Sequence, residues 1–205
     1  MKVKALQVGA WGVNCYLVWC PETREALVID PGQEPEEIAR ELEKEQLKPL
    51  LVVNTHGHLD HIGGNRYISM HYNCPIAIGA GDEEMLTDPK KNYSAQYGQP
   101  ITSPAAAGLL KDGQKLIFGR CQLQVIATPG HSPGGICLYG QGILLSGDTL
   151  FARSIGRSDL PGGSQTQLIA TIKEKLMILP GETRVLPGHG PETTIAAEAK
   201  DNPWL

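Results

Sequence analysis

Hydrophobic residues recur along this chain with two spacings, and the spacing indicates the type of element. Short runs of apolar and β-branched residues between turn residues predict strands. Apolar positions that recur every three or four residues among charged ones predict helices. The predicted strands cover residues 3–8, 13–19, 26–29, 50–54, 75–78, 116–118, 121–127, 135–139, 143–146 and 184–186. The predicted helices cover residues 35–46, 63–72, 82–86, 165–179 and 193–200.

The order of these elements predicts the fold class. Helices separate and follow the blocks of strands, so we expect an α+β protein with two sheets, each covered by helices. No linker-like stretch separates two folding units, and the 205 residues fit one domain. The polar region 79–99 has little pattern beyond its one predicted helix. We expect a mobile loop there that covers the functional site.

Composition and charge narrow the class of protein. The sequence is 41% hydrophobic and 20% charged, and its net charge of −4 provides no basic field for nucleic acid or anionic lipid. The apolar stretch after Lys2 and Lys4 is interrupted by Gly9, Gly12 and Asn14, so it does not form a signal peptide. No run reaches the roughly 20 apolar residues of a membrane span. We therefore expect a cytoplasmic protein that binds neither nucleic acid nor membrane.

The cysteines show no disulfide or catalytic pattern. Their number, five, is odd, no C-x-x-C pair is present, and most lie in strand-like sequence. We interpret them as small buried hydrophobic residues. They are Cys15, Cys20, Cys74, Cys121 and Cys137.

The candidate chemistry is concentrated between residues 56 and 61. The run T-H-G-H-L-D-H places His56, His58, Asp60 and His61 within six positions, although the whole chain holds only six histidines. At this composition we expect such a motif in fewer than about one chain in a thousand. Imidazole and carboxylate groups are preferred ligands of zinc, iron and manganese. The motif therefore predicts a metal site.

The spacing within the motif favours two neighbouring metal positions. His56 and His58 are two residues apart, so an extended backbone directs both side chains to the same side. Asp60 and His61 are adjacent, so their side chains diverge. Gly57 permits a tight bend of the backbone between the ligands.

Three further residues have suitable surroundings for metal ligands. His131, Asp148 and His189 each follow a hydrophobic strand, and each has glycine or proline beside it. Ligands at strand ends are rigidly placed, as a metal site requires. With the motif, they account for five of the six histidines. The remaining one, His71, lies in a predicted helix, and we interpret it as a surface or packing residue.

Taken in order, these motifs resemble those of the metallo-β-lactamase superfamily over nearly the whole chain. The resemblance rests on V-I-D-P-G, which contains Asp30, on T-H-G-H-L-D-H, and on His131, Asp148 and His189. It implies a single-domain, four-layer αβ/βα sandwich, in agreement with the predicted order of strands and helices.

The resemblance also implies how the ligands are divided between two metal ions. The first metal is then bound by His56, His58 and His131, and the second by Asp60, His61 and His189. Asp148 bridges the two metals. Asp30 is implied to be a supporting acid near the site rather than a ligand.

Within the superfamily, the chain is similar to the short bacterial enzymes of the glyoxalase II group. The stretch G-D-T-L-F-A-R-S-I-G-R-S-D-L-P-G-G carries this similarity. The helical extension with which full-length enzymes grip glutathione has no counterpart in residues 190–205. Where those enzymes have a lysine and a tyrosine, this chain has Arg157 and Asp159. Arg157 is a candidate for binding a substrate carboxylate.

The expected reaction is hydrolysis of a small-molecule thioester, an S-2-hydroxyacylglutathione or a related compound. Two metal ions about 3.5–4 Å apart lower the pKa of a shared water toward 7, and the resulting hydroxide attacks the carbonyl. The thiolate leaves without a proton, and Asp60 is the candidate acceptor for the proton of the water. Zinc is the metal we expect, with iron and manganese as alternatives. The sequence carries no signal of oligomeric state.

Other activities are compatible with the same resemblance. A persulfide dioxygenase would use one iron held by His56, His131 and Asp148, but the ligands of a second metal are also present and favour hydrolysis. A β-lactamase fits less well, because a bridging acid such as Asp148 is not typical of those enzymes. A lactonase or esterase is a further alternative, whereas the negative charge disfavours a nuclease. A structural zinc site would be closed and rich in cysteine, unlike this one.

Overall fold

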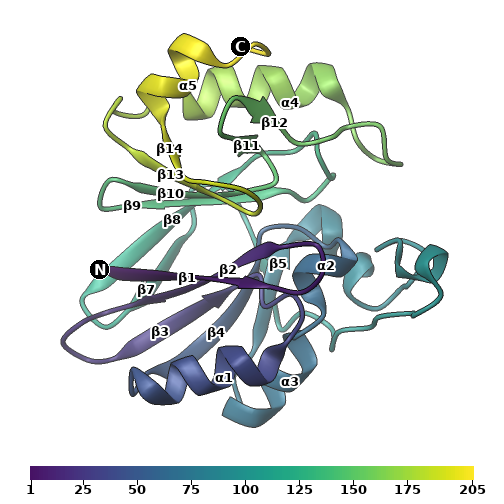
Figure 1. Ribbon diagram of the computed structural model, residues 1–205, viewed down its shortest axis with the longest axis vertical. Helices are drawn as coiled ribbons and strands as arrows, with labels where there is room; N and C mark the ends of the chain where they lie inside the picture. Colours follow the sequence, from purple (N-terminus) through teal and green to yellow (C-terminus); the bar gives the residue numbers. More distant parts are fainter.

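Two six-stranded sheets pack face to face in the computed structural model, which describes residues 1–205 (Figure 1). The first sheet has the order β1 (Lys2–Val8), β2 (Val13–Trp19), β3 (Glu25–Ile29), β4 (Lys48–Asn54), β5 (Ile76–Gly79) and β6 (Gly108–Leu110). The second has the order β14 (Thr193–Thr194), β13 (Arg184–Pro187), β10 (Ile143–Gly147), β9 (Ile136–Gly140), β8 (Cys121–Ala127) and β7 (Lys115–Phe118). A small hairpin joins β11 (Leu150–Phe151) and β12 (Ser154–Ile155).

Helices cover the outer face of each sheet. Figure 1 shows α1 (Pro35–Lys44) and α3 (Asn65–Tyr72) against the first sheet. The second sheet is covered by α4 (Gln165–Thr171), its continuation η3 (Ile172–Leu176), and α5 (Ile195–Asp201). The order of layers is thus helix, sheet, sheet, helix in a single domain. This arrangement confirms the predicted αβ/βα sandwich.

Strand β2 shows why the chain folds into layers. All seven of its residues are buried, and they alternate between two cores. Cys15 and Leu17 belong to the core between the first sheet and its helices, whereas Tyr16 and Val18 belong to the core between the two sheets. Successive side chains of a strand point to opposite faces, so a continuous apolar run serves a sheet that is buried on both faces.

Two predicted helices have different limits in the structure. The predicted helix 35–46 ends at Lys44, because Gln46 takes the left-handed backbone conformation with φ 52°. The predicted helix 63–72 begins two residues later, as α3 at Asn65, and a separate one-turn helix, α2 (Leu59–Ile62), precedes it. Helix α2 carries Asp60 and His61, so the second half of the metal-site motif is helical rather than extended.

The C-terminal helices also differ from the prediction. The predicted helix 165–179 is α-helical only over α4 and then widens into the π-helical turn η3, which ends at Leu176. The predicted helix 193–200 begins two residues later, because Thr193 and Thr194 pair with β13 as β14. The Thr194 side chain then accepts a hydrogen bond from the Ala197 N–H and caps α5.

The region 79–99 contains more secondary structure than the one helix and loop that the sequence predicts. It contains two 3₁₀ helices, η1 (Ala80–Leu86) and η2 (Ser94–Tyr97), in place of the predicted helix 82–86. Asn92 and Tyr93, before η2, and Ser94, its first residue, are buried. Four short strands, β6, β11, β12 and β14, escaped the prediction because two or three residues carry no periodic pattern.

The interpretations of the cysteines and of His71 are confirmed. All five cysteines are buried free thiols. The His71 side chain is 47% exposed and stacks on Tyr67, with ring centroids 5.6 Å apart. No helix in the structure combines the length and the apolar character that crossing a bilayer requires.

One buried carboxylate, Asp82 in η1, joins loops that belong to different sheets. Its oxygens accept hydrogen bonds from the Gly57 N–H at 3.0 Å, the Ser132 hydroxyl at 2.6 Å and the Gly134 N–H at 2.6 Å. Gly57 follows β4 of the first sheet, whereas Ser132 and Gly134 follow β8 of the second. Burial raises the pKa of the Asp82 carboxyl, and the three donors oppose that shift. Asp82 therefore acts as a brace across the end of the sandwich.

We predict that Asp82→Ala lowers the free energy of unfolding by about 3 kcal/mol, because buried donors left without an acceptor cost roughly 1–3 kcal/mol each. Urea denaturation in the presence of a chelator measures this loss without a contribution from bound metal. Asp82→Asn, which keeps one acceptor oxygen, should lose less. Asp201→Ala, at an exposed carboxylate, serves as the control. Equal unfolding midpoints for Asp82→Ala and Asp201→Ala would show that the brace contributes nothing.

Candidate metal centre

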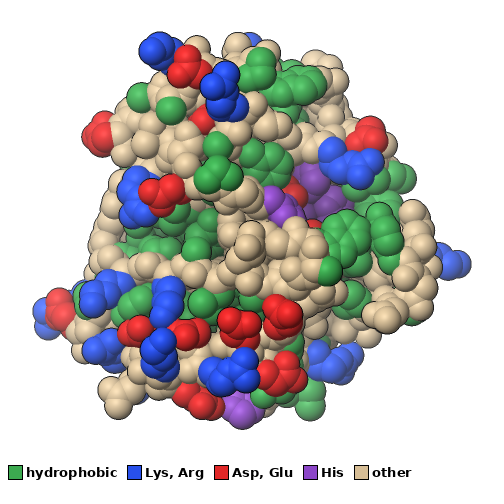
Figure 2. All heavy atoms as spheres, in the orientation of Figure 1, with side chains coloured by type: hydrophobic (Ala, Val, Ile, Leu, Met, Phe, Trp, Pro, Cys, Tyr) green, Lys and Arg blue, Asp and Glu red, His purple; other side chains and the backbone are tan.

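The structure brings all seven predicted ligands together at one end of the sandwich. They lie on the loop after β4, on α2, and on the loops after β8, β10 and β13, so both sheets contribute. Figure 2 shows histidine side chains gathered in a hollow of the surface beside hydrophobic ones. The seven are His56, His58, Asp60, His61, His131, Asp148 and His189, and their ligand atoms form overlapping groups within 4.8 Å.

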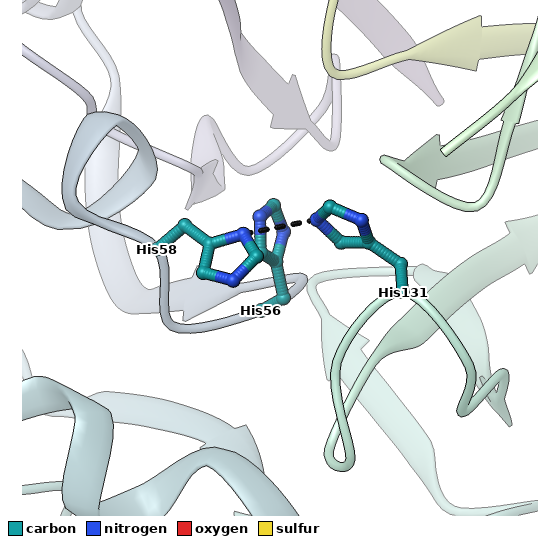
Figure 3. A group of neighbouring side chains, drawn as sticks. All are labelled: His56, His58 and His131. Atoms are coloured by element: carbon teal, nitrogen blue, oxygen red, sulfur yellow. Dashed lines mark hydrogen bonds between the residues drawn. The ribbon is translucent and has the colours of Figure 1, made fainter. Parts of the chain in front are cut away.

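The first group consists of three imidazoles from two loops. Figure 3 shows His56, His58 and His131 pointing toward one another, with His58 Nδ1 at 3.0 Å from His131 Nε2. The other ring nitrogen of His131, Nδ1, lies 2.7 Å from the Arg157 carbonyl, which can only accept. His131 Nδ1 therefore carries a hydrogen in the neutral ring, and Nε2 presents a lone pair to the group.

The second group consists of Asp60, His61 and His189. His189 Nε2 lies 3.2 Å from Asp60 Oδ2 and 3.3 Å from His61 Nε2. The outer nitrogens of both rings face acceptors, since His189 Nδ1 donates to the Trp11 carbonyl at 3.2 Å and His61 Nδ1 is 3.0 Å from a carboxylate oxygen of Asp30. In neutral rings, the inner nitrogens then hold lone pairs that face each other and a carboxylate.

Asp148 lies between the two groups. Its Oδ1 is 3.5 Å from His61 Nε2, and its Oδ2 is 3.8 Å from His131 Nε2 and 3.6 Å from His189 Nε2. One carboxylate thus faces ligand atoms of both groups. This is the position that a bridging ligand requires.

The donor set fits metal ions. His56 Nε2 and Asp148 Oδ1 are buried without any hydrogen-bond partner, and buried polar atoms are rarely left in this way. Separations of 3.0–3.3 Å between inner nitrogens suit ligands about 2.0–2.1 Å from a shared tetrahedral ion. Nitrogen and oxygen donors of this kind accept zinc and other transition metals. The His/Asp cluster is therefore able to bind metal ions.

The pKa values of the cluster differ between the two groups. Burial, reinforced by neighbouring imidazoles, lowers the pKa of His56 and brings that of His58 to about 3. Burial also opposes a charge on His61, but the carboxylates of Asp60, Asp148 and Asp30 raise its pKa to about 10. His56 and His58 are thus neutral donors, whereas the second group attracts a positive charge.

Asp30 supports the cluster through contacts with Thr55 and with the outer ring nitrogen of His61. It is buried at the end of β3, with φ 50°, and its oxygens accept from the Thr55 N–H at 2.7 Å and the Thr55 hydroxyl at 2.6 Å. Thr55 precedes His56 directly. Asp30 therefore contacts the start of the ligand motif and the outer nitrogen of His61, without facing the space where the inner nitrogens converge.

A glycine makes room for the carboxylate of Asp148. A Cβ atom at Gly188 would lie 2.3 Å from Asp148 Oδ1 and 2.8 Å from His61 Cε1. Both distances are well below van der Waals contact. Any side chain at residue 188 would therefore occupy the space in which Asp148 sits.

A cavity of about 400 Å³ opens above the cluster. Its apolar walls are formed by Trp11, Leu59, Tyr93, Tyr97, Phe151 and Leu160. Arg157 also lines it, and its Nε and Nη2 each donate to a carboxylate oxygen of Asp159 at 2.8 Å. The hydrogen-bonded pair lowers the pKa of Asp159 to about 2 and raises that of Arg157. The expectation that region 79–99 lies at the site holds for Tyr93 and Tyr97.

Sequence reasoning missed several residues that shape the site. Asp82 is not distinguished in the sequence from its acidic neighbours Glu83 and Glu84. Trp11 had a signal, since a large aromatic residue between the turn glycines 9 and 12 is a candidate for binding. Tyr97 had none, because it meets Trp11 only through the tertiary fold.

Relatives of similar sequence match this chain over its full length. The probable metallo-hydrolase YqgX of Bacillus subtilis is 36% identical, with coverage of 100% of this chain and 98% of that protein. The hydroxyacylglutathione hydrolase GloC of Haemophilus influenzae is 31% identical, also over 100% of this chain and 98% of the relative.

Solved structures agree with the fold. The BLEG-1 B3 metallo-beta-lactamase has a TM-score of 0.95 at 39% identity, covering 100% of this chain and 99% of that one. TTHA1623, in a di-iron-bound form, has a TM-score of 0.88 at 36% identity, covering 98% of this chain and 100% of that one. ETHE1 from Myxococcus xanthus has a TM-score of 0.82 at 27% identity, covering 99% and 84% respectively.

The sequence profile of the Metallo-beta-lactamase superfamily matches residues 8–189, a stretch that includes every residue of the cluster. The layered fold, the converging ligands and the full-length relatives agree with this match. The chain therefore belongs to the metallo-beta-lactamase superfamily.

Proposed function

We propose that this protein is a dinuclear metal-dependent hydrolase that cleaves thioesters in the manner of glyoxalase II. The observation that carries the proposal is that two groups of candidate ligand atoms both face one carboxylate, that of Asp148. In this proposal His56, His58 and His131 hold the first metal, and Asp60, His61 and His189 hold the second. The GloC relative, a hydroxyacylglutathione hydrolase, supports the choice of substrate class.

Two bound cations would supply an activated hydroxide and a Lewis acid for the carbonyl oxygen. The side chains of the protein hold and orient the reacting groups. The carbonyls of Arg157 and Trp11 fix the rings of His131 and His189, as partners behind a metal ligand typically do. Asp60 is the residue we propose to accept the proton of the attacking water. The thiolate leaves unprotonated, so no general acid is needed.

We also propose which metal the cluster binds, which side chain contacts the substrate and where the protein is located. Zinc suits the donor set, and the di-iron form of TTHA1623 supports iron as the alternative. Arg157 lines the cavity and is proposed to contact a small-molecule substrate. Five buried free thiols suit a reducing compartment, so we propose a cytoplasmic location.

Two solved structures favour specific alternative reactions. The likeness to ETHE1 supports an iron-dependent persulfide dioxygenase, which His56, His131 and Asp148 could serve with one metal. The likeness to BLEG-1, a B3 metallo-beta-lactamase, supports hydrolysis of a β-lactam. A thioester, a persulfide and a β-lactam therefore form the natural panel of test substrates.

We predict that the metal-loaded protein cleaves a thioester from this panel with kcat/KM of at least about 10⁴ M⁻¹s⁻¹, because typical enzymes exceed this value on a suitable substrate. Release of free thiol measures the reaction. The chelator-treated protein should lose activity and regain it on addition of zinc or iron. Oxygen consumption with glutathione persulfide, in the absence of any thioester cleavage, would establish the dioxygenase instead. Cleavage of a cephalosporin alone would establish a β-lactamase.

A second prediction concerns metal content. Elemental analysis should find two metal ions per chain in the reconstituted wild-type protein. Gly188→Ala should hold fewer than two and lose about 10- to 100-fold in kcat/KM, because the added Cβ displaces Asp148 from its position beside His61. Gly108→Ala, where a Cβ meets nothing within 4 Å, is the matched control and should keep both ions. Two tightly bound ions in Gly188→Ala would contradict the bridging role of Asp148.

A further inference from the structure

The wall of the cavity above the metal centre is apolar, and its composition is informative about the substrate. Six hydrophobic side chains line it, four of which are aromatic, and Arg157 is the one lysine or arginine among the lining residues. Asp159 already binds that guanidinium through two hydrogen bonds. Away from the metal positions, the pair leaves little net positive field on the cavity wall. A substrate recognised through carboxylates remote from the metal positions would find no unpaired lysine or arginine on this wall.

Two aromatic residues form an exposed corner of this wall. Trp11, on the turn between β1 and β2, and Tyr97, at the end of η2, meet edge to face with ring centroids 5.0 Å apart. They remain 45% and 57% exposed, among the large hydrophobic residues that are open to solvent. Figure 2 shows hydrophobic side chains beside the histidines on this face. Such a patch beside a reactive centre gains stability when an apolar group covers it.

Two contacts connect the aromatic wall to the metal-binding cluster. The Trp11 carbonyl accepts from His189 Nδ1 at 3.2 Å, which ties the turn to the metal-binding cluster. Tyr93 lies with its ring centroid 5.3 Å from that of His58, and its hydroxyl donates to the Pro161 carbonyl at 3.0 Å. The aromatic wall is therefore attached to both metal-ligand groups, and an apolar group lying on it would be within reach of the reacting carbonyl.

We infer that the substrate carries a bulky apolar group, aromatic or branched, close to its scissile carbonyl, and that Trp11 and Tyr97 bind this group. The inference rests on the proposed thioester hydrolase function. It distinguishes thioesters of apolar acids or thiols from those recognised through the carboxylates of a glutathione unit. Trp11 and Tyr97 are then specificity-determining residues that do not take part in bond cleavage.

A pair of matched substrates tests the inference by kinetics. The phenylacetyl and acetyl thioesters of N-acetylcysteamine differ by one phenyl group on the acyl side, and S-benzyl and S-methyl thioacetate differ by one on the thiol side. The wild-type protein should prefer the phenyl member of at least one pair by 10-fold or more in kcat/KM, mainly through KM. S-D-lactoylglutathione should be a poorer substrate than that phenyl thioester.

Variants assign the preference to the aromatic corner. Trp11→Ala and Tyr97→Ala should each reduce the preference to about 3-fold or less. Trp204→Ala is the matched control, since Trp204 is also 45% exposed but is not among the residues that line the cavity, and it should keep the preference. No phenyl preference in the wild type, or the same preference in all three variants, would overturn the inference.

A binding measurement separates this inference from the proposed function. Ketone analogues, in which a methylene replaces the thioester sulfur, cannot be hydrolysed, and calorimetry measures their affinity for the metal-loaded protein. If no thioester is cleaved, the proposed function fails. In that case at least 10-fold tighter binding of a phenyl ketone than of its methyl counterpart, lost in Trp11→Ala, still supports apolar recognition. Equal affinities, or no binding of either ketone, would overturn it.

Discussion

The organisation of this protein depends on the convergence of Lewis bases at one end of the sandwich. Imidazole nitrogens and carboxylate oxygens approach within 3.0–3.8 Å of one another, and some of them have no hydrogen-bond donor at all. Such a cluster is unfavourable without positive charge, because buried lone pairs repel one another and have lost their hydration. The raised pKa of His61 has the same cause, since a proton on that ring partly compensates the negative charge of the three carboxylates around it. A metal ion satisfies this need far better than a proton.

The layered fold offsets the unfavourable free energy of that convergence. Each sheet is stabilised by its own apolar core and by the core between the sheets, so the strand ends can carry polar groups. The brace through Asp82 joins the loops of both sheets, and Asp30 fixes the start of the histidine motif. Loops that are short, anchored to strand ends and joined to one another thereby set the distances between candidate ligands that are far apart in the sequence.

Much of the site was predictable because its ligands have a chemical signature. His56, His58, Asp60 and His61 lie within six positions, and the later candidate ligands each follow a hydrophobic strand. The supporting residues lacked such a signature. Asp82 resembles any acidic residue of a polar segment, and its function depends on donors 25 and 50 residues away. The wider turn of η3 and the short strands were equally hidden, because tertiary packing rather than local pattern determines them.

The contact between the Trp11 carbonyl and His189 connects ligand binding at the apolar wall with cation binding in the cluster. The ring of Trp11 belongs to the apolar wall, while its backbone orients a member of the metal-binding cluster. Thermodynamic linkage then applies: if a cation on His189 strengthens ligand binding at the wall, a ligand at the wall must strengthen cation binding by the same factor. In a cell where metal is scarce, this reciprocity would let the ligand itself help to keep the protein loaded.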